Sequence, residues 1–285
     1  MNLIRVMPAK ERSVSPLPAH DRNWRTGLSA TVRRLLSLAA GLAGIAALWE
    51  MSVRLADTPA FLLPPPSRIG AAFLARPDYY LGHAAITASE IIIGLVVGTL
   101  LGMATALVIA ASPRLERLVG PALVASQALP VFAIAPLLVI WLGFGLASKI
   151  AMAALIIYFP IATAFADGLR RTDPGLLDLA RLGGAGRGTM LALIRIPAAL
   201  PSLGSGLRVA AGIAPIGAVV GEWVGASAGL GFIMLHANAR MQTDRVFVAL
   251  VILALMAVAL RAAIDRAVRT WLHWVPGEAA EHSQS

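Results

Sequence analysis

One long apolar run limits the folds open to this chain. Residues 86–110 contain a single charged side chain, Glu90. At about 1.5 Å per helical residue, the run is long enough to cross a hydrocarbon core of about 30 Å. Similar runs occupy residues 35–53, 119–142, 150–166, 209–225 and 241–260. Because the runs are continuously apolar and do not alternate, they favour helices over a membrane barrel. The sequence therefore predicts an all-α membrane protein with six transmembrane helices.

The basic residues indicate the orientation of these helices. The chain is 58% hydrophobic and only 14% charged, yet its formal net charge is +9. With a cytoplasmic N-terminus, 18 of the 24 Lys and Arg residues fall on inside segments and six, including Lys149, on outside segments. This positive-inside bias explains the net charge without a nucleic-acid partner, and six spans place both termini in the cytoplasm.

The same pattern divides the chain into three parts. Residues 1–34 are basic and contain several prolines, which predicts a flexible cytoplasmic tail. Residues 35–274 form the predicted six-helix transmembrane domain, and residues 275–285 are predicted to be a disordered tail. The longest inside loop of the domain spans residues 167–208.

This inside loop carries the signals of a short, well-defined helix. Asp173 can cap the helix, and Pro174 suits its first turn. Gly183 and Gly184 can take the left-handed conformation that ends it. A second short helix is expected over residues 188–195, stopping before Pro197, with Pro201 opening the next span.

The first short helix has two distinct faces. Its apolar and small residues recur at helical spacing: Leu176, Leu179, Ala180 and Gly183. Asp178 can pair with Arg181 on the other face. Two interpretations are open: a rigid element offered to a cytoplasmic partner, or a solvated loop that is amphipathic by accident.

The loop also resembles the cytoplasmic loop of binding-protein-dependent ABC importer permeases. That loop has a Glu-Ala-Ala pattern, a Gly four residues later and a downstream Leu-Pro. The matching positions here are Asp178, Leu179, Ala180, Gly184 and Ile196-Pro197. Asp replaces Glu with the charge retained, and Leu replaces the first Ala. The segments FLLPPPSRI, LPVFAIAPLLVIWLGFGLASK and GEWVGASAGLGFIML extend the resemblance across residues 61–274.

The resemblance implies a fold and a set of partners. It implies a type I ABC importer permease fold in the bacterial inner membrane, with a coupling helix at residues 173–184 that contacts a cytoplasmic ATPase subunit. It also implies an extracytoplasmic solute-binding protein and a second permease copy. The chain resembles the branch that carries sulfonates, taurine, nitrate and thiamine pyrimidine precursors, with the hydroxymethylpyrimidine permeases most similar.

The sequence contains no GxxxxGK[ST] phosphate-binding motif. The chain is therefore expected to be a transport subunit without its own ATPase site, and no cofactor is predicted. His83 and His236 have no second ligand at a suitable spacing, so no metal site is predicted either.

Candidates for the substrate path are Gln127, Pro130, Glu222 and Trp223. Pro130 removes a backbone donor and can kink its helix, leaving carbonyls free for a cavity. Gln127 can contact substrate or form an interhelical hydrogen bond. Glu222 near a span end can serve transport or sit in interfacial water. Glu90 is expected to be solvated or structural.

Two features admit other interpretations. Gly94, Gly98 and Gly102 form a ridge that suits helix packing more than a ligand path. Residues 225–229 match the G-x-S-x-G pattern of a serine hydrolase around Ser227, with His236 nearby, but a nucleophile elbow needs a strand before the turn. A passive channel explains the spans but not the capped loop.

Overall fold

We describe the protein from a computed structural model that covers residues 25–127 and 130–275. The predicted tails lie mostly outside this part, although helix α1 (Arg25–Leu55) begins within the first of them. The chain divides into two compact units, Met1–Met51 and Ser52–Ser285, and the first contains most of α1. The predicted span 35–53 falls within α1.

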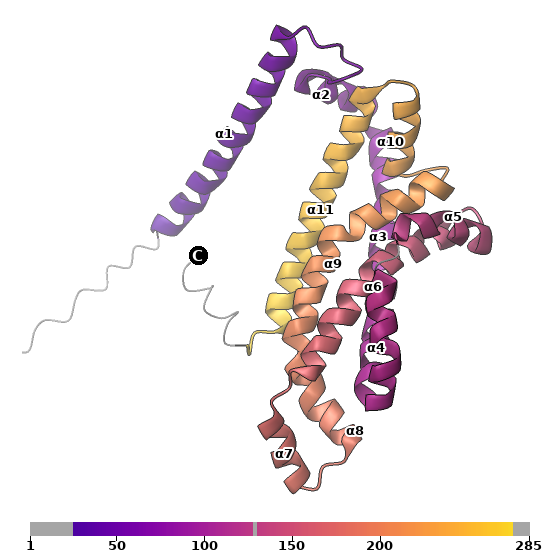
Figure 1. Ribbon diagram of the computed structural model, residues 1–285. Helices are drawn as coiled ribbons and strands as arrows, with labels where there is room; N and C mark the ends of the chain where they lie inside the picture. Colours follow the sequence, from indigo (N-terminus) through magenta and orange to yellow (C-terminus); the bar gives the residue numbers. More distant parts are fainter. Residues whose placement is uncertain (1–24, 128–129, 276–285) are drawn as a thin grey trace, which may run out of the picture. The chain divides into compact units, whose positions relative to one another are not determined.

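The second unit is built from helices, and the described residues contain no strand (Figure 1). The helices that follow α1 are α2 (Pro66–Ala75), α3 (Pro77–Ala111), α4 (Pro113–Gln127), α5 (Val131–Leu142), α6 (Leu146–Arg170), α7 (Pro174–Leu182), α8 (Arg187–Met190), η1 (Leu191–Arg195), α9 (Ile196–Gly225), α10 (Leu230–Ala239) and α11 (Thr243–Trp271). The all-α prediction is confirmed.

The core lies where α6 packs between α3 and α9. The glycine ridge of α3 makes this approach possible, because a Cβ atom on Gly94 would come within 2.6 Å of Ala153 Cβ and one on Gly102 within 2.8 Å of Ile161 Cγ2. Large aliphatic and aromatic side chains of α6, such as Phe165, are fully buried beside the ridge. The packing interpretation of the ridge is confirmed.

Four helical segments among the described residues are long and apolar enough to cross a membrane: Pro77–Ala111, Leu146–Arg170, Arg187–Gly225 and Thr243–Trp271. They contain the predicted spans 86–110, 150–166 and 209–225 and nearly all of 241–260. Their burial differs. In Arg187–Gly225, 56% of the most apolar 18-residue stretch is buried, whereas in Thr243–Trp271 the share is only 11%. The last helix therefore lies at the edge of the unit.

The third predicted span, residues 119–142, is wrong as a single continuous helix. The structure divides it into α4 and α5, and Pro130 precedes the first residue of α5. Proline lacks a backbone N–H and restricts the residue before it, so a helix is interrupted there. α4 has 15 residues and α5 has 12, so each is shorter than a full span.

The predicted stop before Pro197 is also wrong. The chain stays helical from α8 through the π-helical turn η1 into α9, and Pro201 lies inside α9 instead of opening it. The Ile196 N–H bonds the Leu191 carbonyl in the wide π-helical pattern. The missing N–H of Pro197 therefore falls where the helix changes type, and not within a regular α-helical ladder.

Candidate functional site

The helix expected in the inside loop is present as α7, and its start is capped as the sequence predicts. The Asp173 side chain accepts a hydrogen bond of 2.8 Å from the Gly175 N–H. Pro174 is the first helical residue, where its missing N–H costs nothing. The start of α7 is thus determined by local sequence.

The end of α7 has the hydrogen bonds of a Schellman motif. The Gly184 N–H bonds the Arg181 carbonyl at 2.9 Å, and the Ala185 N–H bonds the Ala180 carbonyl at 2.9 Å. Gly184 has φ +78°, so the prediction of a left-handed residue is confirmed there. It is wrong for Gly183, whose φ is −74°.

The surface of α7 is exposed on both faces. The Leu179 side chain is 67% exposed and Leu182 is 88% exposed. Arg181 Nη1 lies 2.6 Å from Asp178 Oδ1, which is the predicted pair. An apolar helix surface of this kind is left without a protein partner in the described chain.

The structure brings four of the five predicted coupling residues together. Asp178, Leu179 and Ala180 lie on α7, and Gly184 follows its end. Pro197 lies apart from them, as the second residue of α9. The compact candidate surface is therefore α7 with its glycine end, which we call the α7 surface (residues 173–184).

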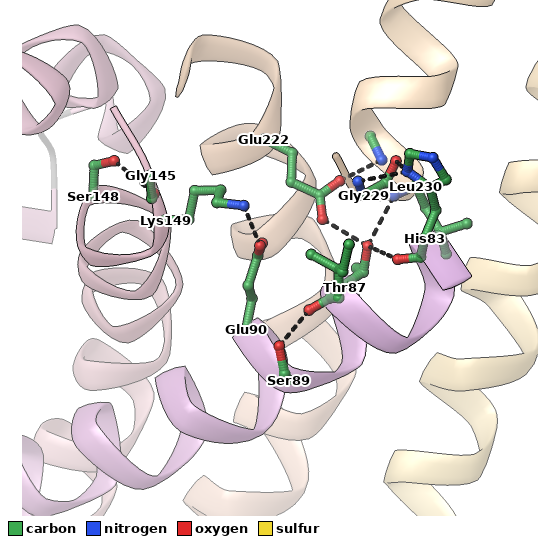
Figure 2. Close-up of polar contacts among 12 residues, drawn as sticks. His83, Thr87, Ser89, Glu90, Gly145, Ser148, Lys149, Glu222, Gly229 and Leu230 are labelled. Carbon is green, nitrogen blue, oxygen red and sulfur yellow. Dashed lines mark hydrogen bonds and ion pairs between the residues drawn. The ribbon is translucent and has the colours of Figure 1, made fainter. Parts of the chain in front are cut away.

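Glu222, near the C-terminal end of α9, belongs to a second polar region (Figure 2). The residue is only 1% exposed. Thr87 Oγ1 donates to Glu222 Oε1 at 2.6 Å, and the Gly231 N–H donates to Glu222 Oε2 at 2.5 Å. Both carboxylate oxygens are thus bonded within the protein, so the interfacial-water interpretation does not hold here.

Three successive backbone N–H groups at the start of α10 receive side-chain acceptors from other helices. Gly229 N donates to His83 Nδ1 at 2.8 Å, and Leu230 N donates to Thr87 Oγ1 at 2.8 Å. Gly231 N is the third donor, to Glu222. The first N–H groups of a helix lack partners within the helix, so α3 and α9 together cap α10. We call His83, Thr87 and Glu222 the α10 cap.

The α10 cap also explains a glycine in the G-x-S-x-G stretch. Gly229 has φ +123°, and a Cβ atom there would lie 2.2 Å from the Glu222 carboxyl carbon. Ser227 is exposed in the connection between two helices, and His236 Nδ1 contacts the Phe232 carbonyl in its own helix. Because a helix and not a strand enters this turn, the nucleophile-elbow interpretation is unsupported.

Beside the α10 cap lies an ion pair that the sequence analysis missed. Lys149 Nζ on α6 pairs with Glu90 Oε1 on α3, and the two side chains are 8% and 0% exposed. Lys149 was expected in an outside loop but lies in the first turn of α6. Glu90 is buried, so of its two expected roles the solvated one is wrong and the structural one holds. A lone charge in an apolar run needs a partner, which was the one available signal, but the sequence does not identify which residue provides it.

The hydrogen bonds of Glu222 to α3 and α10 involve none of the other predicted path residues. Trp223 is 48% exposed on the neighbouring position of α9, and Pro130 is exposed before α5. Gln127 ends α4, and its side chain lies outside the described residues. A role for these residues in transport stays a prediction.

Comparison with known proteins gives consistent relatives. Residues 98–271 match the family described as "Binding-protein-dependent transport system inner membrane component". A probable ABC transporter permease protein of Haemophilus influenzae is 47% identical over 218 residues, covering 76% of this chain and 89% of that protein. The formylaminopyrimidine transport permease protein ThiX of Halalkalibacterium halodurans is 36% identical over 228 residues, covering 80% and 91%.

A similar fold occurs in a chain from a crystal structure of an amino acid ABC transporter with histidines. The TM-score is 0.55 at 18% identity, and the match covers 72% of this chain and 98% of the solved one. At this identity the likeness concerns the fold alone.

Proposed function

Since this chain belongs to the family of inner-membrane components of binding-protein-dependent transport systems, we propose that two copies of it line the translocation pathway of one ABC importer. The chain is the permease subunit. Among the described residues of one copy, four helical segments are long enough to span the membrane, and one of them, Thr243–Trp271, lies at the edge, with only 11% of its most apolar stretch buried. A second copy is the partner that a closed, symmetric pathway requires.

The α7 surface is the proposed docking site of a cytoplasmic ATPase subunit. Its caps at both ends keep α7 rigid, while Leu179 and Leu182 are exposed. An amphipathic helix with an uncovered apolar surface fits a groove on a partner. This is the observation on which the function rests, because a passive channel has no need of such a helix.

The proposed topology places α7 in the cytoplasm. Arg114 lies in the first turn of α4, just after α3, and Arg170 and Arg171 lie at the end of α6, in keeping with the positive-inside bias. The opposite end, with α2 and the connection from α10 to α11, would then face an extracytoplasmic binding protein. Both termini are cytoplasmic in this arrangement.

The proposed cargo is a small polar solute of the thiamine pyrimidine precursor class. The support is the 36% identity to a protein named as a formylaminopyrimidine permease. Uptake of a radiolabelled aminopyrimidine by vesicles containing the complete importer tests this class. Uptake of taurine in its place would assign the chain to sulfonate transport.

The docking proposal is tested by Gly184→Leu. A side chain at φ +78° costs about 1–2 kcal/mol, and the leucine also blocks close approach of a partner. We expect membrane insertion to persist and co-purification of the ATPase subunit to be lost.

Gly186→Leu is the matched control, because Gly186 lies two residues away with φ −71° and open space around its Cβ position. It should retain the ATPase. Wild-type ATPase binding and transport by Gly184→Leu would refute the docking assignment.

A further inference from the structure

Arg195 makes an unusual set of hydrogen bonds at the base of the inside loop. Its guanidinium donates from Nε and Nη2 to the Leu169 carbonyl at 3.1 and 3.0 Å. It also donates from Nη1 to the Ala110 carbonyl at 3.1 Å. One side chain at the end of η1 thus holds two other helices.

Both acceptors lie in the last turn of a helix. α6 ends at Arg170 and α3 ends at Ala111, so Leu169 and Ala110 are the penultimate residues. Carbonyls in a last turn have no partner within their helix, and a cation there also interacts favourably with the helix dipole. The planar guanidinium can bond two acceptors at once, which a lysine ammonium on a single flexible stem does less well.

The bond to Leu169 closes the inside loop at its base. The chain leaves α6 at Arg170, passes through α7 and α8, and returns at Arg195 to bond the residue before its exit. A displacement of α7 therefore acts on α6 from both ends of the loop.

The bond to Ala110 extends the connection to α3, which is distant in sequence from the loop. A cavity of about 480 Å³ lies between these parts, lined by Ala110 and Ala111, by Leu177 and Arg181 of α7, and by Arg195. Because space separates α7 from the end of α3 at this cavity, the guanidinium is a polar bridge between the loop and α3.

The π-helical turn sets the direction of Arg195. The Ile196 N–H bonds the carbonyl five residues earlier, so η1 contains one residue more than an α-helical turn. Removing that residue would rotate the following positions by about 100°. Such turns are frequent at functional sites, and here the turn determines where the bridging side chain points.

We propose that Arg195 is a positioning residue that transmits the movement of α7 to α3 and α6. The inference rests on the proposed docking of an ATPase on the α7 surface. In this role Arg195 contacts neither ATP nor the transported solute. Its three bonds make the base of the loop and the inner ends of both helices move together.

The chain has no cysteine, which allows a direct test by single-cysteine labelling. Gly186→Cys reports on the loop beside α7, and Asp78→Cys reports on the exposed first turn of α3 at its opposite end. Each is placed in the complex with the ATPase subunit, with and without Arg195→Gln. Labelling by a water-soluble maleimide is measured without nucleotide and with ATP and vanadate.

In the otherwise unchanged complex, ATP and vanadate should alter the labelling rate at both positions. With Arg195→Gln we expect the response at position 186 to persist and the response at position 78 to be lost. Arg195→Lys, which retains the charge but not the planar guanidinium, should show the same loss. It replaces Arg195→Gln in the test if the complex with Arg195→Gln does not assemble.

Arg208→Gln is the matched control, because Arg208 is a partly buried arginine of α9 that bonds Asp265 on α11 at 2.8 Å. It should leave both responses in place. A retained response at position 78 in both Arg195 variants, or an equal loss in Arg208→Gln, would overturn the proposal. No response at position 186 without any Arg195 change would instead refute ATPase docking on α7, and the role of Arg195 would fall with it.

Discussion

Near one end of α3 and α9, charged and polar side chains are buried and bonded to one another, whereas α7 at the other end leaves its charges and most of its leucines exposed. Glu222 is 1% exposed with both carboxylate oxygens bonded, while Asp178 on α7 is bonded only across an exposed surface. The first arrangement fixes the positions of helices. The second leaves an exposed surface that matters only when a partner binds to it.

The difference follows from the surroundings. A charge away from water is tolerated only when it is paired or hydrogen-bonded, so changing one partner leaves a costly unpaired group. An exposed ion pair replaces contacts of each charge with water by a contact between the two side chains, so it contributes little to folding. We therefore expect changes in the buried region to affect stability and changes on α7 to affect partner binding.

The largest effect on stability is expected from Lys149→Met. The substitution leaves Glu90 buried without its cation, at a cost of about 3–5 kcal/mol. Denaturant unfolding of the purified chain in detergent measures this loss. The double variant Glu90→Gln/Lys149→Met removes both charges and should recover most of the stability. Equal stability of the single and double variants would mean that the ion pair is not the cause.

Gly229→Ala comes next. Its φ of +123° is a conformation that other residues rarely adopt, which costs about 1–3 kcal/mol before the clash with the Glu222 carboxylate is counted. Gly212→Ala is the control, since Gly212 lies within α9 with open space at its Cβ position and alanine favours helix. Thermal unfolding should place Gly229→Ala well below the wild type and Gly212→Ala at or above it. The opposite order would contradict the α10 cap.

These two regions also differ in how far the sequence predicts them. The caps of α7 are local, since Asp173, Pro174 and Gly184 act within a few residues of their own positions, and all three roles are confirmed. The partners of Glu90 and Glu222 lie on other helices, and their pairing depends on how α3, α6 and α9 pack. Local sequence patterns carry no information on which side chains of different helices come together.

The predictions of where helices end near Pro130 and Pro197 were wrong for a related reason. Pro130 and Pro197 are chemically alike at the sequence level, yet one separates two helices and the other continues a helix after a π-helical turn. Proline removes a hydrogen bond in both places, and only the surrounding backbone decides whether another pattern replaces it. Helix α10 was missed because its N-terminus is completed by side chains of α3 and α9.

A smaller effect is expected from Thr87→Val. This change keeps the shape of the side chain but removes the acceptor for Leu230 N and the donor to Glu222, at a cost of about 1–3 kcal/mol. Thr99→Val provides the control, because the Thr99 hydroxyl is buried on the same helix without a hydrogen-bond partner in the described structure. Unfolding in detergent should separate the two variants. Equal costs would mean that the bonds of Thr87 add nothing to the α10 cap.

The smallest effect on stability is expected from Asp178→Ala. The pair with Arg181 is exposed on both sides, at 67% and 61%, so its loss should change the free energy of unfolding by about 0–1 kcal/mol. Asp167→Ala is a matched control, because Asp167 forms the same i, i+3 pair with Arg170 at the end of α6, also exposed. Both variants should unfold like the wild type, but Asp178→Ala should retain less of the ATPase subunit on co-purification. If the two variants bind the ATPase equally well, the charge on α7 does not take part in docking, and the contrast between the two ends then rests on the leucines and Gly184 alone.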